Sequence, residues 1–209
     1  MPVPALASRR KPVNAARLST NAAIAAKPND LGDVALKVVA GFAAGALGVW
    51  ALDRLDWFMW GQEDAEARAR TTAVRPDGEP PAQALVSKME NATGKHLEPG
   101  THETASQVVH YAIGIAPAIG YALLRDKLPI SGVARGALYG AGLFLTQDEV
   151  LNTVTGLGAK PQDYPWQAHA RGIVAHTTYG IVTELALVLV DRIRVGRTRA
   201  VDGVAIERS

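Results

Sequence analysis

Four long apolar segments alternate with polar segments along the chain. An α-helix needs about 20 apolar residues to cross the hydrocarbon core of a bilayer, and these segments reach that length. The pattern therefore predicts an all-α integral membrane protein, built as a four-helix bundle. We expect the spans at residues 34–60, 104–124, 130–151 and 168–191, within a transmembrane domain that covers residues 33–194.

The last apolar segment, Trp166 to Arg194, carries ionisable residues inside it. At about 100° per residue, one stripe of this helix is polar or small and the opposite face is Val and Leu. The stripe holds His169, Gly172, His176, Gly180 and Thr183, with Glu184 at its margin. A carboxylate in hydrocarbon costs at least a few kcal/mol, so Glu184 is expected to face other helices or a wet crevice.

Charged residues gather in the segments that flank and connect the apolar runs. Residues 1–32 form a predicted basic flexible tail, residues 61–103 a polar loop, and residues 195–209 a basic C-terminal tail. Asp33 is expected to cap the first span. The Arg-rich, acid-poor composition of residues 1–30 also fits an organellar transit peptide, an alternative that the sequence leaves open.

The distribution of Lys and Arg predicts the orientation. Four spans place both termini on one side, and Lys and Arg are more numerous on that side than on the other. The positive-inside rule then puts both termini in the cytoplasm. The net charge is only +2, with no basic face, so nucleic acid is not expected as a partner. The chain has no cysteine, which excludes disulfides and thiolate chemistry.

This topology brings ionisable side chains from four helices to the outer half of the membrane. They are Asp53, Asp56, His110, Asp148, Glu149, His169 and His176, with Glu184 about 12 Å deeper than His176. Because histidine titrates near neutral pH, the set is a candidate proton-responsive cluster. A structural interpretation stays open, in which these residues cap helices or hydrogen-bond across them and Glu184 pairs with Arg135 or with a backbone donor.

Glycines recur at helix-packing spacing on three of the predicted spans. They are Gly41, Gly45 and Gly48 in the first span, Gly136 and Gly140 in the third, and Gly172 and Gly180 in the fourth. We expect them to allow close helix contacts, either within the chain or with other membrane protein subunits or a second copy.

No pattern in the sequence indicates an enzyme or a cofactor. There is no nucleophile elbow and no Gly-rich phosphate loop. The spacings H-x-x-E-H and E-x-x-H are absent as well, so a His/carboxylate metal site stays a lesser alternative.

The segment from His110 to Arg194 resembles the YagU-like family of small bacterial inner-membrane proteins. The resemblance rests on an H-x7-E spacing inside the last span and on several short motifs. These residues are Gly136, Ala137, Leu138, Gly156, Leu157, Pro161, Pro165, Trp166, His176, Glu184, Arg192 and Arg194. It implies a multi-pass protein of the bacterial inner (cytoplasmic) membrane, linked to acid tolerance and without an established biochemical activity.

Together these features predict a small inner-membrane protein of the acid-tolerance kind that contacts membrane lipids. His110, His176 and Glu184 are expected to respond to protons or to relay them. One alternative is an accessory structural subunit packed against a larger membrane complex. Others are a His/carboxylate metalloprotein and a fully soluble bundle.

Overall fold

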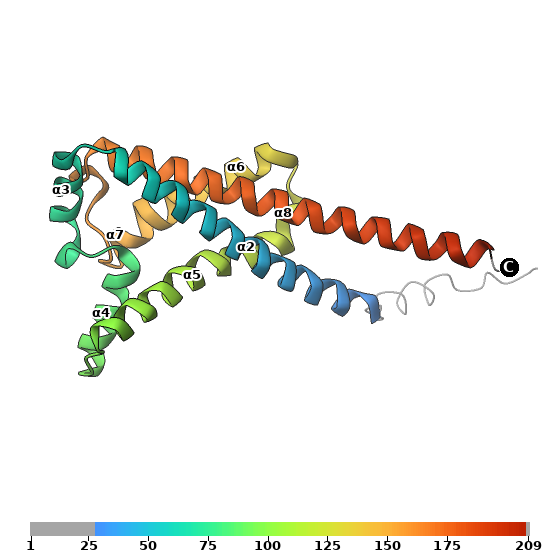
Figure 1. The fold of residues 1–209 in the computed structure, drawn as a ribbon, viewed down its shortest axis with the longest axis horizontal. Helices are drawn as coiled ribbons and strands as arrows, with labels where there is room; N and C mark the ends of the chain where they lie inside the picture. Colours follow the sequence, from blue (N-terminus) through green and yellow to red (C-terminus); the bar gives the residue numbers. More distant parts are fainter. Residues whose placement is uncertain (1–27, 208–209) are drawn as a thin grey trace, which may run out of the picture. The chain divides into compact units, whose positions relative to one another are not determined.

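A computed structural model describes the backbone of residues 28–207 and the side chains of residues 31–194. Its regular elements in that range are all helices, with no strand among the described residues, which confirms the all-α class (Figure 1). Two compact units are recognised, residues 1–35 and 36–209. The predicted flexible tail lies outside the described residues as far as residue 27, and so do the side chains of residues 195–209.

Three helices are long and apolar enough to cross a membrane, and they cover Leu31–Gln62, Pro99–Lys127 and Trp166–Arg194. The full set of elements is α2 (Pro28–Gln62), α3 (Ala65–Val74), η1 (Pro76–Gly78), α4 (Pro81–Thr93), α5 (Pro99–Leu124), η2 (Arg125–Lys127), α6 (Gly132–Leu143), η3 (Phe144–Leu151), α7 (Asn152–Val154), η4 (Pro161–Asp163) and α8 (Trp166–Glu207).

The third predicted span, residues 130–151, is not among those three helices. It begins as α6, continues through the π-helix η3 and ends in the short α7. A π-helix is rare and occurs often at functional sites. Here it contains Asp148 and Glu149, the polar residues that interrupt the apolar run.

The predicted start of the first helix was wrong. The helix α2 begins at Pro28, so Asp33 lies inside it and is not its N-cap. Proline suits the first turn of a helix because its missing N–H would have no partner there. The polar segment 61–103 folds into α3 and α4, close to the exposed helix at residues 63–70 and the short amphipathic helix at residues 82–93 that the sequence allows. Asp64 caps α3 by accepting a hydrogen bond from the Ala67 N–H at 2.7 Å.

Within residues 36–209, small residues let α2 approach two other helices. A Cβ at Gly41 would lie 2.8 Å from the Ile119 Cα of α5, and one at Gly45 would lie 2.6 Å from the Ala118 Cβ. A Cβ at Gly48 would lie 2.8 Å from the Tyr179 ring of α8. Because later residues of α2 meet earlier residues of α5 and α8, α2 is antiparallel to both helices.

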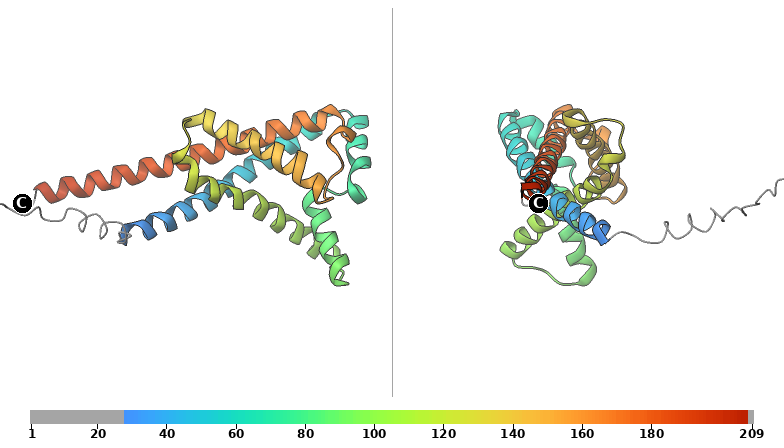
Figure 2. Two further views of the ribbon diagram at one scale, coloured as in Figure 1. Left: turned by 180° about the vertical axis from the view of Figure 1, so that it is seen from behind. Right: turned by 90° about the vertical axis from the view of Figure 1, so that its right-hand side faces the viewer.

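The helices α6 and α8 are in close antiparallel contact, as both views of Figure 2 show. A Cβ at Gly136 would lie 2.6 Å from the Gly180 carbonyl oxygen, and one at Gly140 would overlap the His176 carbonyl. One turn further along, Gly172 faces the Phe144 ring. The helical run 132–154 therefore lies alongside residues 172–184 of α8.

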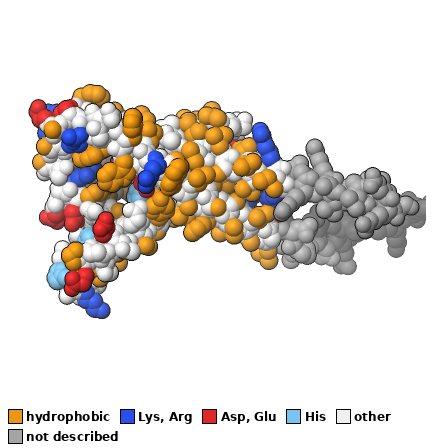
Figure 3. All heavy atoms as spheres, in the orientation of Figure 1, with side chains coloured by type: hydrophobic (Ala, Val, Ile, Leu, Met, Phe, Trp, Pro, Cys, Tyr) orange, Lys and Arg blue, Asp and Glu red, His pale blue; other side chains and the backbone are white. Residues whose placement is uncertain are grey.

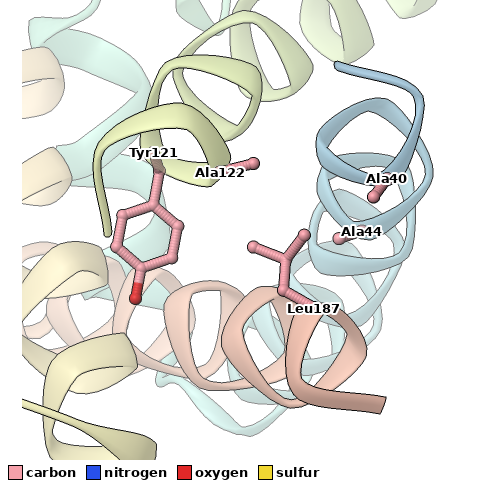
Figure 4. Close-up of a cluster of buried hydrophobic side chains, with 5 residues drawn as sticks. All are labelled: Ala40, Ala44, Tyr121, Ala122 and Leu187. Carbon is pink, nitrogen blue, oxygen red and sulfur yellow. The ribbon is translucent and has the colours of Figure 1, made fainter. Parts of the chain in front are cut away.

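The core between α2, α5 and α8 consists of small and aromatic side chains. One cluster contains Ala40 and Ala44 from α2, Tyr121 and Ala122 from α5, and Leu187 from α8, which point toward one another (Figure 4). The alanines explain how three helix backbones come close enough for a single leucine and a tyrosine to fill the space.

Large apolar side chains cover much of the outer surface of these helices (Figure 3). They include Phe42, Trp50, Val108, Leu138 and Leu189, each more than half exposed. Continuous apolar surface of this kind marks a contact with lipid or with another protein. The acidic side chains on this face gather instead at the end formed by the polar connections, on the left of Figure 3.

Candidate functional site

Two histidines are paired with carboxylates of a neighbouring helix. The His110 Nε2 of α5 lies 2.8 Å from the Asp53 Oδ1 of α2. The His176 Nδ1 of α8 lies 3.0 Å from the Gly172 carbonyl oxygen and 3.7 Å from the Asp148 Oδ2 of η3. Because a carbonyl oxygen only accepts, the His176 Nδ1 carries the hydrogen. Both imidazoles satisfy these bonds in their neutral form, which leaves one ring nitrogen free to take up a proton.

A third histidine has acceptors on both sides of its ring. The His169 Nδ1 lies 2.7 Å from the Glu149 Oε1, and its Nε2 lies 3.0 Å from the Pro161 carbonyl oxygen. Two hydrogens are needed to satisfy both bonds, whereas a neutral imidazole and an ionised carboxylate together supply only one. A neutral imidazole can therefore donate to only one of these two acceptors, whereas a protonated imidazole can donate to both.

These residues surround a cavity of about 290 Å³, which we call the histidine pocket. Its walls come from α2, α5, η3 and α8, and the segment from Thr71 to Ala82 contributes to its rim. The residues that bear on function are His110, His169, His176, Asp56, Asp148, Glu149, Arg75, Arg171 and Thr71. Figure 3 shows a hollow at this end of the molecule, with histidine and acidic side chains around it.

Arg171 lies in the wall of the histidine pocket, although only 7% of its side chain is exposed. Its Nε donates to the Asp56 Oδ1 at 2.9 Å and its Nη1 to the Glu63 Oε1 at 2.5 Å. Its guanidinium also lies 4.6 Å from the centroid of the Trp60 ring, while that of Arg75 lies 5.8 Å away. Burial lowers the pKa of the Arg75 guanidinium. Arginine nevertheless keeps its charge in proteins.

Glu184 lies in a separate cluster, deeper in the bundle. It is fully buried and accepts hydrogen bonds from Tyr121 at 2.7 Å, from the Arg125 Nη1 at 2.8 Å and from the Arg135 Nη2 at 2.6 Å. Arg125 also donates to Asp191. Two guanidiniums thus face two carboxylates, and the Glu184 cluster is neutral. Such complete pairing is the condition under which buried charge is tolerated.

Aromatic side chains lie between the histidine pocket and the Glu184 cluster. The Tyr179 hydroxyl donates to the Gly114 carbonyl at 2.6 Å and lies 3.2 Å from the Tyr139 hydroxyl. Tyr139 in turn stacks on Tyr121, with ring centroids 4.0 Å apart. Stacked rings pass no proton, so the structure does not bring Glu184 into one hydrogen-bonded set with the histidines.

A fourth histidine links two helices beyond the pocket. The His102 Nδ1 of α5 lies 3.0 Å from the Glu90 Oε2 of α4, and the Leu97 N–H donates to the Glu90 Oε1 at 2.5 Å. The Leu97 N–H, assisted by His102, lowers the pKa of Glu90. This contact holds the end of α4 against α5.

Two functional side chains escaped the sequence analysis, namely Arg125 and Arg171. The sequence places Arg125 in a short loop and Arg171 near a helix end, where most arginines are solvated. One feature of the sequence could have identified Arg171. It lies at the outer end of the fourth span, near the acidic residues at the outer ends of the other spans, and a buried cation needs paired carboxylates. Among residues 31–194 no group of three or more His, Asp or Glu side chains has the arrangement of a metal site.

Comparisons with protein-family models, curated proteins and solved structures find no match to this chain. The resemblance to the YagU-like family therefore stays a prediction.

Proposed function

We propose that the protein is a four-pass membrane protein that responds to external protons through the histidine pocket. The single observation that carries the proposal is the pairing of His110 with Asp53 and of His176 with Asp148, each across two helices. Both imidazoles keep a nitrogen that can take up a proton. The expected role is that of a bacterial inner-membrane protein in acid tolerance.

Four passes are supported by the contact between the third and fourth predicted spans. The run 132–154 packs along α8 from Glu184 to Gly172, so both helical segments lie in the same layer. If α8 crossed the bilayer and the run 132–154 did not, the Glu184 cluster would face lipid on the side of α6. Arg135 of α6 occupies that side. Four passes place both termini on the cytoplasmic side and the histidine pocket on the outer side.

The proposed response is a change in helix pairing. With a neutral imidazole, a hydrogen bond joins His110 and Asp53, whereas His176 and Asp148 only lie close together. When the imidazole takes up a proton, the carboxylate opposite becomes its ion partner, and the attraction between opposite charges is added to the existing contact. External acid is thus expected to tighten the link between α2 and α5 through His110, and the link between η3 and α8 through His176.

Glu184 has a structural part in this proposal. Its carboxylate is matched by Arg125 and Arg135, so external protons reach the histidines without involving it. In this proposal the proton-responsive groups are therefore the histidines of the pocket and not Glu184.

The test uses a variant with His110→Gln and His176→Gln, because glutamine keeps a hydrogen-bond donor but does not titrate near neutral pH. The exposed His96→Gln is the matched control. We expect the thermal stability of the purified parent and control in detergent to rise as the pH falls from about 7.5 to about 5, where histidine titrates. The double variant should show a flatter pH dependence.

In cells, the double variant should lose the protection of internal pH under acid challenge that the parent and control confer. An equal pH dependence of stability in all three proteins would contradict the proposal. A C-terminal reporter that was active only outside the cytoplasm would contradict the four-pass topology.

The accessory-subunit alternative now has less support. Its motivation was the small-residue faces at Gly41, Gly45, Gly136 and Gly140, and these glycines contact other helices of the same chain. Recovery of the free protein after gentle detergent extraction would remove the remaining case for that alternative.

A further inference from the structure

The histidine pocket is lined by apolar as well as polar side chains. The apolar lining includes Val49 and Leu52 of α2, Ile113 of α5, and Leu143 and Phe144 at the junction of α6 and η3. At about 290 Å³ the cavity is close to the lower limit of small-molecule sites, which are concave, largely apolar and furnished with a few polar groups. The dimensions therefore suit a compact ligand with an apolar body.

Asp148 is the charged group of this pocket with the weakest partners. The His176 Nδ1 lies 3.7 Å from its Oδ2, and the Asn152 Nδ2 lies 3.4 Å from its Oδ1. Its side chain is 37% exposed, and the residue lines the pocket. By contrast, Asp56 and Glu149 have partners at 2.9 Å and 2.7 Å.

Thr71, in the wall of the pocket, has a buried hydroxyl without a partner among the described residues. A buried hydroxyl without a partner is costly and requires an explanation.

The carboxylates around the pocket outnumber the arginines. Arg171 faces Asp56 and Glu63, while Asp53 lies beside His110 and Glu149 beside His169. The remaining positive charge, on Arg75, lies over the Trp60 ring and is opposed by Asp148. With His110 and His176 neutral, the sum of these charges is negative, and protonation of both histidines makes it less negative.

We propose that the histidine pocket binds an organic ammonium group attached to an apolar body, and that protons compete with this ligand for Asp148. The inference rests on the proposed proton uptake by the pocket histidines. In neutral conditions the ammonium donates to the Asp148 carboxylate while the apolar body contacts the apolar side chains of the lining. Acid places a positive charge on His176, which satisfies Asp148 and expels the ligand.

An anion fits the pocket less well. The guanidinium of Arg171 is already taken by two carboxylates, and Arg75 stacks on an indole face, a favourable place for a cation. An anionic ligand would also meet Asp148 in neutral conditions. We therefore expect an ammonium ligand to bind more tightly than its uncharged analogue.

The test measures binding by calorimetry to the full chain in an uncharged detergent. The probes are 2-phenylethylammonium and its uncharged analogue 2-phenylethanol, which share one apolar body. We expect the ammonium to bind about tenfold more tightly at about pH 7.5, as a hydrogen bond to a charged group predicts. At about pH 5 this preference should disappear.

Two variants separate the charge of Asp148 from the shape of the pocket. In Asp148→Asn the preference for the ammonium should be lost at about pH 7.5, while 2-phenylethanol binds as before, which shows that the pocket is intact. Asp126→Asn, which removes an exposed carboxylate paired with Lys37 outside the pocket, should leave both affinities unchanged.

The ammonium can belong to a soluble amine or to an ethanolamine lipid headgroup. Phosphatidylethanolamine added to the micelles distinguishes these sources, because a headgroup ligand would weaken 2-phenylethylammonium binding and a soluble amine site would not be affected. Equal binding of the two probes at the higher pH, no binding of either, or a preference that persists in acid would overturn the proposal. None of these results would alter the pH dependence of stability in the ligand-free protein, so the two proposals fail separately.

Discussion

Replacement of Glu184 by glutamine is expected to cost about 3 kcal/mol of unfolding free energy, since removing one partner of a buried ion pair typically costs 3 to 5 kcal/mol. The side chain is fully buried, so solvent does not compensate the loss. The amide oxygen can still accept from Arg135, but the amide nitrogen would face the donors of Tyr121 and Arg125. A cost of this size shifts the folding equilibrium more than a hundredfold.

The measurement is reversible unfolding of the purified protein in mixed micelles. Asp126→Asn is the matched control, because Asp126 is 55% exposed and its pair with Lys37 is an exposed one. Exposed ion pairs contribute about 0 to 1 kcal/mol, so the control should lose less than that. If Glu184→Gln lost no more than this control, the neutral Glu184 cluster would not be a main source of stability.

A second substitution tests the cause. Arg135 is the cation that loses its only carboxylate when Glu184 is neutralised, whereas Arg125 keeps Asp191. Adding Arg135→Gln to Glu184→Gln should therefore cost less than the sum of the single effects, as expected for two residues in one network. Additive costs would show that the loss arises from packing and not from charge.

Two further predictions concern helix contacts. Gly140→Leu should separate α6 from α8, because even a Cβ would overlap the His176 carbonyl. It should cost at least 1 to 3 kcal/mol in the same unfolding assay, about the cost of overpacking. Gly142 faces open space, so Gly142→Leu should be nearly neutral. The folded-state pKa of Glu90 is lowered, so its bond from the Leu97 N–H stabilises the α4–α5 contact above the ordinary glutamate pKa of about 4.3. This stabilisation is lost as the pH falls through the lower, folded-state pKa. Spin labels on α4 and α5 should therefore move apart in acid in the parent, whereas Glu90→Gln should show no such pH dependence.

The amino-acid sequence by itself determined the helical class and the positions of three apolar helices. A run of apolar residues long enough to cross a bilayer satisfies its own backbone hydrogen bonds only as a helix, whatever surrounds it. Residues 130–151 are largely helical as well, but Asp148 and Glu149 interrupt the apolar pattern there and the sequence did not predict the π-helix. The prediction failed at Asp33, because a proline five residues earlier can begin the helix equally well.

The tertiary structure decided which charges meet. Helical periodicity places Glu184 and His176 on one side of α8, but it does not state which helix lies opposite each turn. Packing sets Arg125 and Arg135 against Glu184, and Asp148 against His176. The two residues therefore differ in chemistry although they share a helix face, since the charge state of a buried group depends on partners that are distant in the sequence.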